Sequence, residues 1–347
     1  MSMEGHFNEP WLDASAPHGE VVLSCRARLA RNIAGFPFVN HATAAQRKEL
    51  LRVARQVLLG GGLSSGMIWV DLGRATEHDR RLLVERHLIS KNLADSDIDR
   101  AVAISGDESL SVMVNEEDHL RIQILAAGLQ LESIHERLNE IDDHVEGKVD
   151  YAFSRRWGYL TACPTNVGTG IRFSVMMHLP ALKITNEIDR VRRAAKDLHL
   201  AVRGYYGEGS ESAGDFYQIS NQVTLGRSEE ELLGELKDKI LPRIIEYEQQ
   251  ARRVLVERNE TLLDDRTQRA LGILRSARLL GAEEAMKLLS RVRLAIALGR
   301  LPEIDPRVVN QLFLQVQPAH LQFQAERPLS AEQLRVTRAT IVRKAFA

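Results

Sequence analysis

Short apolar segments with strand-like or helical spacing fill the first two-thirds of the chain. Strand patterns lie at 67–71, 101–105, 110–114, 120–126, 172–179 and 216–225. Helical spacing of apolar residues covers 44–59, 78–90, 129–145 and 187–198. Because the strands between 101 and 126 follow one another with short links, we expect them to pair antiparallel.

The last third predicts helices with few breaks. Ser228-x-x-Glu231 is a capping box that opens a long helix. Further helical stretches are expected at 262–279, 282–298, 305–316 and 330–345. Only four of the 23 glycines lie beyond residue 227. The pattern therefore predicts an α+β fold, with an antiparallel sheet flanked by helices, followed by an all-helical domain.

Composition narrows the class of protein. The 347 residues hold 46 Lys+Arg and 47 Asp+Glu, so no net charge draws the chain to nucleic acid or to a membrane surface. The two cysteines, Cys25 and Cys163, exclude a disulfide framework and a four-cysteine zinc site. The first 22 residues do not resemble a signal peptide, and no 18-residue apolar run is present. We expect a cytoplasmic protein with no membrane segment and no direct contact with nucleic acid.

Several arginines stand next to polar turns. Arg26 and Arg28 lie in Ser24-Cys-Arg-Ala-Arg28, Arg121 follows the acidic turn 115–119, Arg172 follows the loop 163–170, and Arg203 opens Arg203-Gly-Tyr-Tyr-Gly-Glu208-Gly. Each feature alone has an ordinary interpretation: a solvated arginine, an exposed turn at 116–118, a small buried cysteine at 163. The glycine-rich P-loop and the H-E-x-x-H zinc motif are both missing.

Taken together, these residues indicate phosphate chemistry. Guanidinium groups bind phosphate oxygens bidentately, and several of them neutralise a triphosphate without a glycine-rich loop. A carboxylate beside them can orient or deprotonate a nucleophile, and a cysteine thiolate adds a fixed negative charge. Phosphoryl transfer needs mainly positioning and charge stabilisation, together with Mg²⁺.

Three segments carry a family resemblance. Cys163-Pro-Thr-Asn-Val-Gly-Thr-Gly-Ile-Arg172, Asn115-Glu-Glu-Asp-His-Leu-Arg121 and Ser24-Cys-Arg-Ala-Arg28 resemble the phosphagen (guanidino) kinase family, and within it the bacterial protein-arginine kinases. Val84–Ser90, Val175–Leu182 and the segment from Arg203 support this in the expected order. The resemblance covers roughly residues 20–347. It implies a catalytic domain at 21–250 with a phosphagen-kinase-like sheet, a helical C-terminal domain at 251–347 and an N-terminal extension at 1–20.

The resemblance also implies roles for individual residues. Glu117 and Glu208 would grip the acceptor guanidinium, with Glu117 taking its proton, and Cys163 would be the reactive cysteine, tuned by Thr165. The implied ATP contacts are Ser24, Cys25, Arg26, Ala27, Arg28, His87, Arg121, Arg172, Phe173, Ser174, Val175, Met176, Arg203, Gly204, Tyr205, Tyr206, Gly207 and Glu208. The cofactors implied are ATP and Mg²⁺, with the metal carried by ATP rather than held in a separate protein site.

The expected substrate is arginine in proteins. Small-molecule members of the family carry a helical domain before the first arginine segment, whereas about twenty residues precede it here. We therefore expect an open site that admits exposed arginine side chains of proteins. The alternatives are a kinase of free arginine or another small guanidino compound, and a binding protein with an inactive site.

The resemblance further implies partners and regulation. Marking proteins for Clp-type proteolysis or altering stress-regulator activity, a McsA-like activator, a Clp unfoldase and a homodimer are its expectations. Relatives under allosteric control carry an R-D-x-x-R-A motif that binds phosphoarginine. The matching residues 334–339 here read Leu-Arg-Val-Thr-Arg-Ala, so we expect no phosphoarginine feedback at this place. We interpret Arg335, Arg338 and Arg343 as the solvated face of a C-terminal helix.

Overall fold

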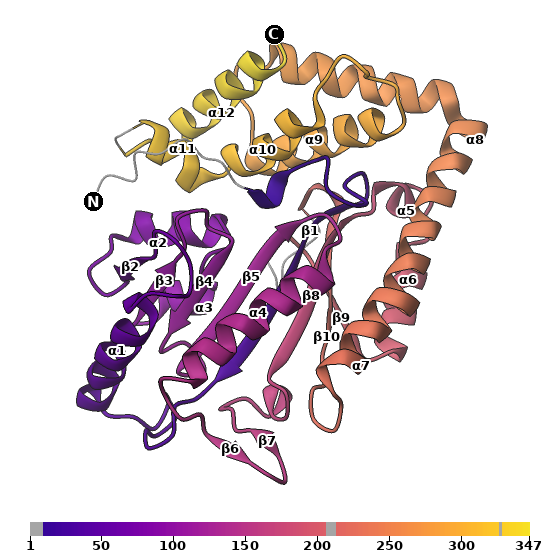
Figure 1. Cartoon of the computed structure of the whole chain (residues 1–347). Coiled ribbons are helices and arrows are strands. Elements are labelled where there is room, and N and C mark those ends of the chain that lie inside the picture. Colours follow the sequence, from indigo (N-terminus) through magenta and orange to yellow (C-terminus); the bar gives the residue numbers. More distant parts are fainter. Residues whose placement is uncertain (1–9, 206–212, 326–327) are drawn as a thin grey trace.

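The centre of the molecule is an antiparallel sheet (Figure 1), seen in a computed structural model that describes residues 10–205, 213–325 and 328–347. Eight strands follow the order β2-β3-β4-β5-β1-β8-β10-β9, and every neighbouring pair is antiparallel. The strands are β1 (Val22–Arg31), β2 (Ile68–Asp71), β3 (Ala101–Ile104), β4 (Leu110–Val114), β5 (Leu120–Ala127), β8 (Ile171–His178), β9 (Leu200–Arg203) and β10 (Phe216–Asn221). A separate hairpin joins β6 (Phe153–Ser154) to β7 (Gly158–Tyr159). The predicted α+β class with an antiparallel sheet is confirmed.

Strand β1 lies in the middle of the sheet, between β5 and β8, and was not among the predicted strands. Its residues alternate between two environments: Cys25, Ala27 and Leu29 lie in the apolar core, while Arg26 and Arg28 face the other way. Because Arg26 and Arg28 occupy alternate positions, we interpreted the segment from its sequence as a charged stretch next to a polar turn and not as a strand. The charged positions face a pocket instead of bulk solvent.

Six helices cover the apolar face of the sheet. They are α1 (Ala44–Leu59), α4 (Leu131–Glu146), α5 (Pro180–Ile184), α6 (Ile188–Asp197), α7 (Glu229–Gly234) and α8 (Leu241–Ser276), with a π-helical segment at Glu235–Ile240. Helices α2 (Glu77–Glu85) and α3 (Lys91–Asp95) pack on the other face, against Val102, Ile104 and Met113. Leu50 of α1, Leu138 of α4, Val191 of α6 and Leu255 of α8 pack in one cluster with Phe173 of β8. Burying each such side chain contributes about 1.5–3 kcal/mol, so this face anchors the sheet.

The helix predicted at 78–90 ends five residues earlier than expected, and a separate helix, α3, begins after it at Lys91. Helix α2 ends at Glu85, and His87 has a backbone φ of 59°, which no α-helix accommodates. Ser90 then caps α3, since its Oγ accepts a hydrogen bond from the backbone N–H of Leu93 at 3.0 Å. The break turns His87 and Ser90 toward the arginine-bearing face of the sheet, where both line a pocket.

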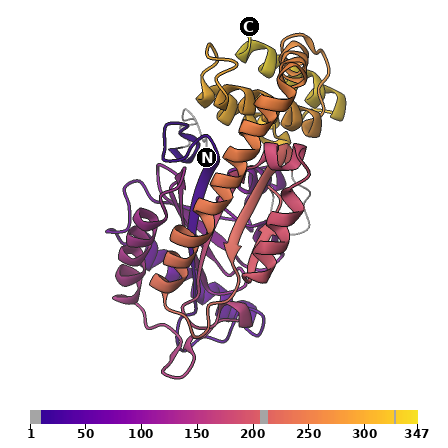
Figure 2. The ribbon, with the colours of Figure 1, turned by 90° about the vertical axis from the view of Figure 1, so that its right-hand side faces the viewer.

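The C-terminal helices form a second layer above the sheet (Figure 2). They are α9 (Ala282–Ala297), α10 (Pro306–Gln315), α11 (Pro318–Ala325) and α12 (Ala331–Ala345). The stretch predicted at 262–279 is not a separate helix but the end of α8, which spans 36 residues and is kinked at Asn259. The predicted domain boundary at 250/251 therefore falls inside α8. No helix in the described ranges is both long and apolar enough to cross a membrane.

A second apolar core joins these helices to the sheet. It contains Leu289 and Phe313 of the helical layer together with Phe216 of β10. Trp11 and Leu12, from the short 3-10 helix η1 (Pro10–Leu12), are also buried in it. These two residues of the predicted N-terminal extension are thus packed between the sheet and the helical layer.

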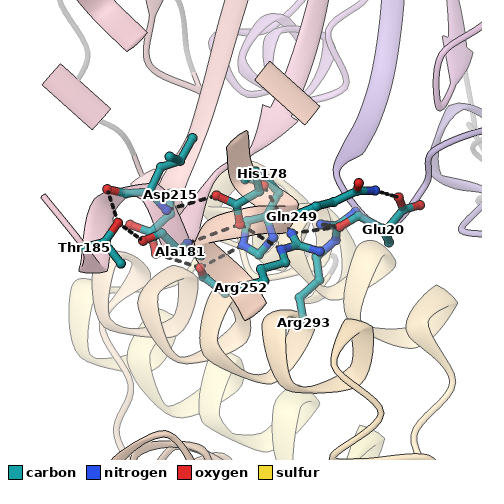
Figure 3. A network of polar contacts seen from close by, with 11 residues as sticks. Glu20, His178, Ala181, Thr185, Asp215, Gln249, Arg252 and Arg293 are labelled. Carbon is teal, nitrogen blue, oxygen red and sulfur yellow. Dashed lines mark hydrogen bonds and ion pairs between the residues drawn. The ribbon is translucent and has the colours of Figure 1, made fainter. Parts of the chain in front are cut away.

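Buried arginines fasten the helical layer to the sheet (Figure 3). Arg252 of α8 and Arg293 of α9 both donate to the backbone oxygen of Glu20, at 3.1 and 3.2 Å. Arg252 also pairs with Glu248 at 2.8 Å. Burial and the charge of Arg252 lower the pKa of Arg293 to about 9. Such contacts are costly to break, because a lost partner leaves a charge buried.

The interpretation of Arg338 as a solvated residue is wrong. Arg338 is buried, and its Nε and Nη1 donate to the backbone oxygens of Val316 and Leu280 at 2.7 and 2.9 Å. Arg343 is half-buried, whereas Arg335 is exposed as predicted. Arg338 therefore bonds carbonyl groups at the ends of neighbouring helices.

Candidate active site

A single open pocket of about 940 Å³ gathers most of the predicted chemistry. It lies on the face of the sheet opposite the apolar core. Five arginines from four strands line it, together with His87, Glu117 and Cys163. The five are Arg26, Arg28, Arg121, Arg172 and Arg203.

Strand register explains why these arginines meet. Arg28 of β1 stands directly opposite Arg172 of β8, and Arg26 stands opposite Ser174. Arg121 of β5 pairs with Ala30 of β1, two positions beyond Arg28. Directly paired residues of antiparallel strands project to the same face of the sheet. Three segments far apart in sequence therefore present their guanidinium groups side by side.

The pocket holds more positive charge than it can balance. Burial and the charges of Arg121, Arg172 and Arg203 lower the pKa of Arg26 to about 9. Burial, Arg203 and Arg121 likewise lower the pKa of Arg172, and the pKa of Arg28 is well below its ordinary value for the same kind of reason. Lowered pKa values mean that each charged guanidinium is destabilised by its surroundings. A bound polyanion would relieve this repulsion.

Glu116 is the acidic partner within this cluster. Its Oε1 and Oε2 accept hydrogen bonds from Arg121 Nη1 at 2.7 and 2.6 Å, and Ser90 Oγ donates to Oε1 at 2.6 Å. Burial raises the pKa of Glu116, but Arg121 and Ser90 outweigh it, so the pKa is lowered overall. Glu116 thus stays ionised and holds Arg121 in place.

Hydrogen bonds to Asp118 hold the turn that carries Glu117. Asp118 Oδ1 accepts hydrogen bonds from Asn32 Nδ2 at 2.6 Å and from the backbone N–H of Ala162 at 2.7 Å. Glu117 itself is exposed and lines the pocket. Because Ala162 immediately precedes Cys163, the anchor also sets the position of the cysteine loop relative to Glu117.

Cys163 lines the same pocket, on the loop that follows Ala162. Its Sγ is 3.0 Å from Thr165 Oγ1, and either atom serves as donor. The charges of Cys163 and Glu117 both act to raise the pKa of Arg172, which places the two groups near one guanidinium. A thiol, a carboxylate and an arginine cluster thus share one site.

Two protein-family models match adjoining parts of the chain. The ATP:guanido phosphotransferase C-terminal catalytic domain matches residues 60–251, and the McsB protein-arginine kinase C-terminal domain matches residues 260–347. A protein-arginine kinase of Symbiobacterium thermophilum is 47% identical over 96% of this chain and 95% of its own length. The chain belongs to the protein-arginine kinase family. A further member, from Halothermothrix orenii, is 43% identical over 96% of this chain and 95% of its own length.

Solved phosphagen kinases share the fold of this family member. The duplicated taurocyamine kinase of Schistosoma mansoni, with bound transition-state analogue components, has a TM-score of 0.62 and 30% identity over 67% of this chain and 34% of that one. A lombricine kinase has a TM-score of 0.58 and 29% identity over 69% of this chain and 70% of its own. Both similarities agree with the antiparallel sheet flanked by helices.

Several predicted ATP contacts lie away from the pocket in this kinase. Cys25, Ala27, Phe173 and Val175 alternate with the pocket residues, so their side chains lie in the apolar core on the other face of the sheet. Burial raises the pKa of Cys25 to about 12, and its Sγ accepts a hydrogen bond from the backbone N–H of Gln130. These four residues shape the strands rather than line the site.

The remaining predicted contacts divide into three groups. Ser24, Ser174 and Met176 line a small cavity of about 20 Å³ that also contacts Arg26 and His87. Tyr205 lines the main pocket, while Gly204 is buried beside it. Tyr206, Gly207 and Glu208 lie outside the described residues.

His87 is enclosed by aromatic rings at one end of the pocket. Its ring makes edge contacts with Trp11 and Tyr205, with centroid distances of 5.3 and 5.4 Å. Burial, followed by the charges of Arg26 and His320, lowers its pKa to about 3. His87 is therefore neutral at physiological pH and presents a flat, uncharged group to a ligand.

The pocket-lining residues that sequence reasoning did not single out include Glu116, Ser90 and Gln218. Glu116 was assigned to an exposed turn, and Ser90 to the end of a helix. The capping position of Ser90 before Lys91 was a usable signal. Gln218 alternates with core residues of β10, so strand periodicity placed it on the arginine face.

The described residues offer no protein-held metal site. Across 10–205, 213–325 and 328–347, no three His, Cys, Asp or Glu side chains gather in a way that would hold a metal ion. The pocket fits an anion, because its donors are guanidinium groups with few acidic partners.

Proposed function

We propose that the protein transfers the γ-phosphoryl group of ATP to the guanidinium group of arginine side chains in other proteins. The observation that carries the proposal is the convergence of five arginines, Glu117 and Cys163 in one pocket. The near full-length similarity to proteins named protein-arginine kinase supports the choice of acceptor. It also disfavours the alternative, a kinase of free arginine.

The arginine cluster is proposed to bind the triphosphate. Arg26, Arg28 and Arg172 are buried among other positively charged arginines, which destabilises their charged forms. Phosphate oxygens would offset this repulsion by accepting charge-assisted hydrogen bonds from the guanidinium groups. The same groups would stabilise charge on the phosphoryl group during transfer. Mg²⁺ bound to ATP supplies further charge neutralisation. His87 is proposed to contact the nucleoside side of the ligand.

The acceptor guanidinium is proposed to lie between Glu117 and Cys163. A protonated guanidinium is a poor nucleophile, so a carboxylate must orient it and remove a proton. Glu117 is exposed in the pocket and held on an anchored turn, which suits that role. A Cys163 thiolate would add negative charge near the acceptor. Glu208 is proposed as the second carboxylate.

The broader role is proposed from family membership. We infer that phosphorylation marks proteins for Clp-type proteolysis or alters stress regulators, in the cytoplasm, with a McsA-like activator and a Clp unfoldase as partners and a homodimer as the assembly. Two cysteines that form no disulfide agree with a reducing compartment. Phosphoarginine feedback through residues 334–339 is not expected, because Arg338 bonds backbone carbonyls.

A single comparison tests the proposed reaction. The protein is incubated with MgATP and either casein or free arginine, and the products are analysed by mass spectrometry at neutral pH. Phosphoarginine on casein is expected, with a rate at least about 10²-fold lower for Glu117→Ala. Near-normal turnover of Glu117→Ala would refute the assignment of the base. Phosphorylation of free arginine alone would move the protein to the small-molecule branch.

A further inference from the structure

The β6–β7 hairpin projects at the bottom of the view in Figure 1. It carries exposed aromatic and basic side chains that do not line the pocket. Phe153 and Trp157 are 58% and 44% exposed, although large aromatic side chains gain most from burial. Arg155 and Arg156 are exposed in the turn between the two strands. Clustered exposed aromatic groups of this kind mark interaction surfaces.

The hairpin is held in one shape. The backbone N–H of Trp157 donates to Ser154 O at 3.2 Å, and the guanidinium of Arg156 lies 4.6 Å from the centre of the Trp157 ring. Phe153 makes an edge contact with Tyr159 at a centroid distance of 5.3 Å. Tyr159 in turn lies against the buried guanidinium of Arg31 at 3.5 Å. A surface that is already ordered loses little entropy when a partner binds.

The hairpin is joined to the loop that carries Cys163. Tyr159 and Gly168 exchange backbone hydrogen bonds of 2.8 and 3.3 Å. Gly168 in turn packs against Leu225, since a Cβ added to Gly168 would lie 2.9 Å from Leu225 Cα. Leu225 is 43% exposed, and Val223, which lines the pocket, is 47% exposed. The backbone therefore links the hairpin to the cysteine loop and to the segment at 223–225, which carries exposed apolar side chains beside the pocket.

We propose that this hairpin rim, made of Phe153, Arg155, Arg156, Trp157, Val223 and Leu225, binds the polypeptide that flanks the target arginine. The inference rests on the proposed function. The pocket accommodates a guanidinium group, so the neighbouring residues of a folded or unfolded substrate must lie along its rim. Aromatic and arginine side chains are the types that contribute most to such contacts.

The chemistry of the rim defines the preferred substrate. Phe153, Trp157, Val223 and Leu225 offer apolar contact, which favours an aliphatic or aromatic residue near the target arginine. Arg155 and Arg156 attract acidic residues and repel basic ones. The rim thus selects arginines flanked by apolar and acidic residues, and disfavours arginines within lysine-rich segments.

Peptide kinetics test the inference. Two 15-residue peptides carry one central arginine, flanked either by leucine and glutamate or by serine and lysine. The double variant Phe153→Ala/Trp157→Ala is expected to raise KM for the leucine–glutamate peptide at least about tenfold. Its affinity for ATP, measured by titration calorimetry, is expected to stay unchanged. Tyr247→Ala, which removes a 53% exposed aromatic side chain from α8, is the matched control and should leave KM unchanged.

Charge reversal provides an independent arm. Arg155→Glu/Arg156→Glu is expected to lower the preference for the glutamate-flanked peptide over the lysine-flanked one by about tenfold or more. An unchanged preference, together with an unchanged KM for the aromatic double variant, would overturn the inference. So would a change in molecular mass by light scattering without a change in KM, since the hairpin would then be a self-association surface. If the unmodified protein phosphorylates neither the peptides nor casein, the proposed function itself fails.

Discussion

Removing Glu116 tests whether repulsion among the pocket arginines is real. The Glu116 side chain is 5% exposed and the Arg121 side chain 23% exposed, and the two are joined by contacts of 2.6 and 2.7 Å. Breaking a fully buried pair costs about 3–5 kcal/mol. Because water reaches part of Arg121, we expect Glu116→Ala to lower the free energy of unfolding by about 2–3 kcal/mol. For a domain of this size that corresponds to a melting temperature lower by roughly 4–12 °C.

The anion response of the same variant sharpens the test. Without Glu116, the uncompensated arginines should gain more from phosphate oxygens than they do in the unmodified protein. We therefore expect MgATP or tripolyphosphate to raise the melting temperature of Glu116→Ala by more than that of the unmodified protein. Scanning calorimetry with and without each ligand measures both effects. Glu140→Ala is the control, because it removes an exposed carboxylate from a surface pair with Arg137 and should change neither value.

Two results would refute this reasoning. A melting temperature of Glu116→Ala within 1 °C of the unmodified protein would show that Glu116 does not offset the arginine charge. The second result is a tripolyphosphate-induced rise in melting temperature that is no larger for Glu116→Ala than for the unmodified protein. It would show that repulsion among the arginines does not contribute to anion binding. Either result would also weaken the proposed triphosphate role of Arg121.

Three further predictions concern the support of the pocket. Glu85 accepts hydrogen bonds from the backbone N–H and the Nδ1 of His320 in α11, at 3.0 and 2.8 Å, so Glu85→Ala should loosen the end of α2 and raise KM for ATP more than it changes kcat in steady-state assays. Gly170→Ala should lower kcat about tenfold or more, because φ there is +69° and the new Cβ would lie 2.7 Å from Ala30 O. Burial, with the charges of two arginines, holds the pKa of His178 well below its ordinary value. In the unfolded chain this histidine gains a proton near pH 6.5, whereas in the folded protein it stays neutral. The free energy of unfolding is therefore highest above about pH 6.5 and falls as the pH drops below that value. Between pH 7.5 and 5.5, urea unfolding should show a loss of about 1.4 kcal/mol that is absent in His178→Gln.

Each of these predictions has a result that contradicts it. An unchanged KM for ATP in Glu85→Ala would mean that the helical layer does not position the nucleotide end of the pocket. Gly272→Ala, a substitution in α8 with open space around the new Cβ, is the control for Gly170→Ala and should keep full activity. Equal pH dependence of the unmodified protein and His178→Gln would show that His178 is not buried in its neutral form.

Local pattern was sufficient for much of the fold. The helix at Ala44–Leu59 and the strand at Leu110–Val114 were predicted with their observed bounds, because each has clear periodicity and a clear cap or turn at its ends. The capping box at Ser228 is present as predicted. Strand β1 was missed although Ser24, Arg26 and Arg28 alternate with apolar residues. Such alternation also fits a strand whose charged side chains line a pocket, and this possibility was not considered.

The sequence by itself determined which groups are available: five arginines next to turns, a glutamate in an acidic turn and a cysteine in a glycine-rich loop. Only the tertiary structure decided that these groups meet. Arg28 and Arg172 are 144 positions apart in the chain, yet they stand opposite each other because β1 pairs with β8 in one register. A shift of one residue would turn every side chain of a strand to the other face. The register of such pairing depends on the packing of the whole sheet, so it cannot be predicted from the local sequence pattern.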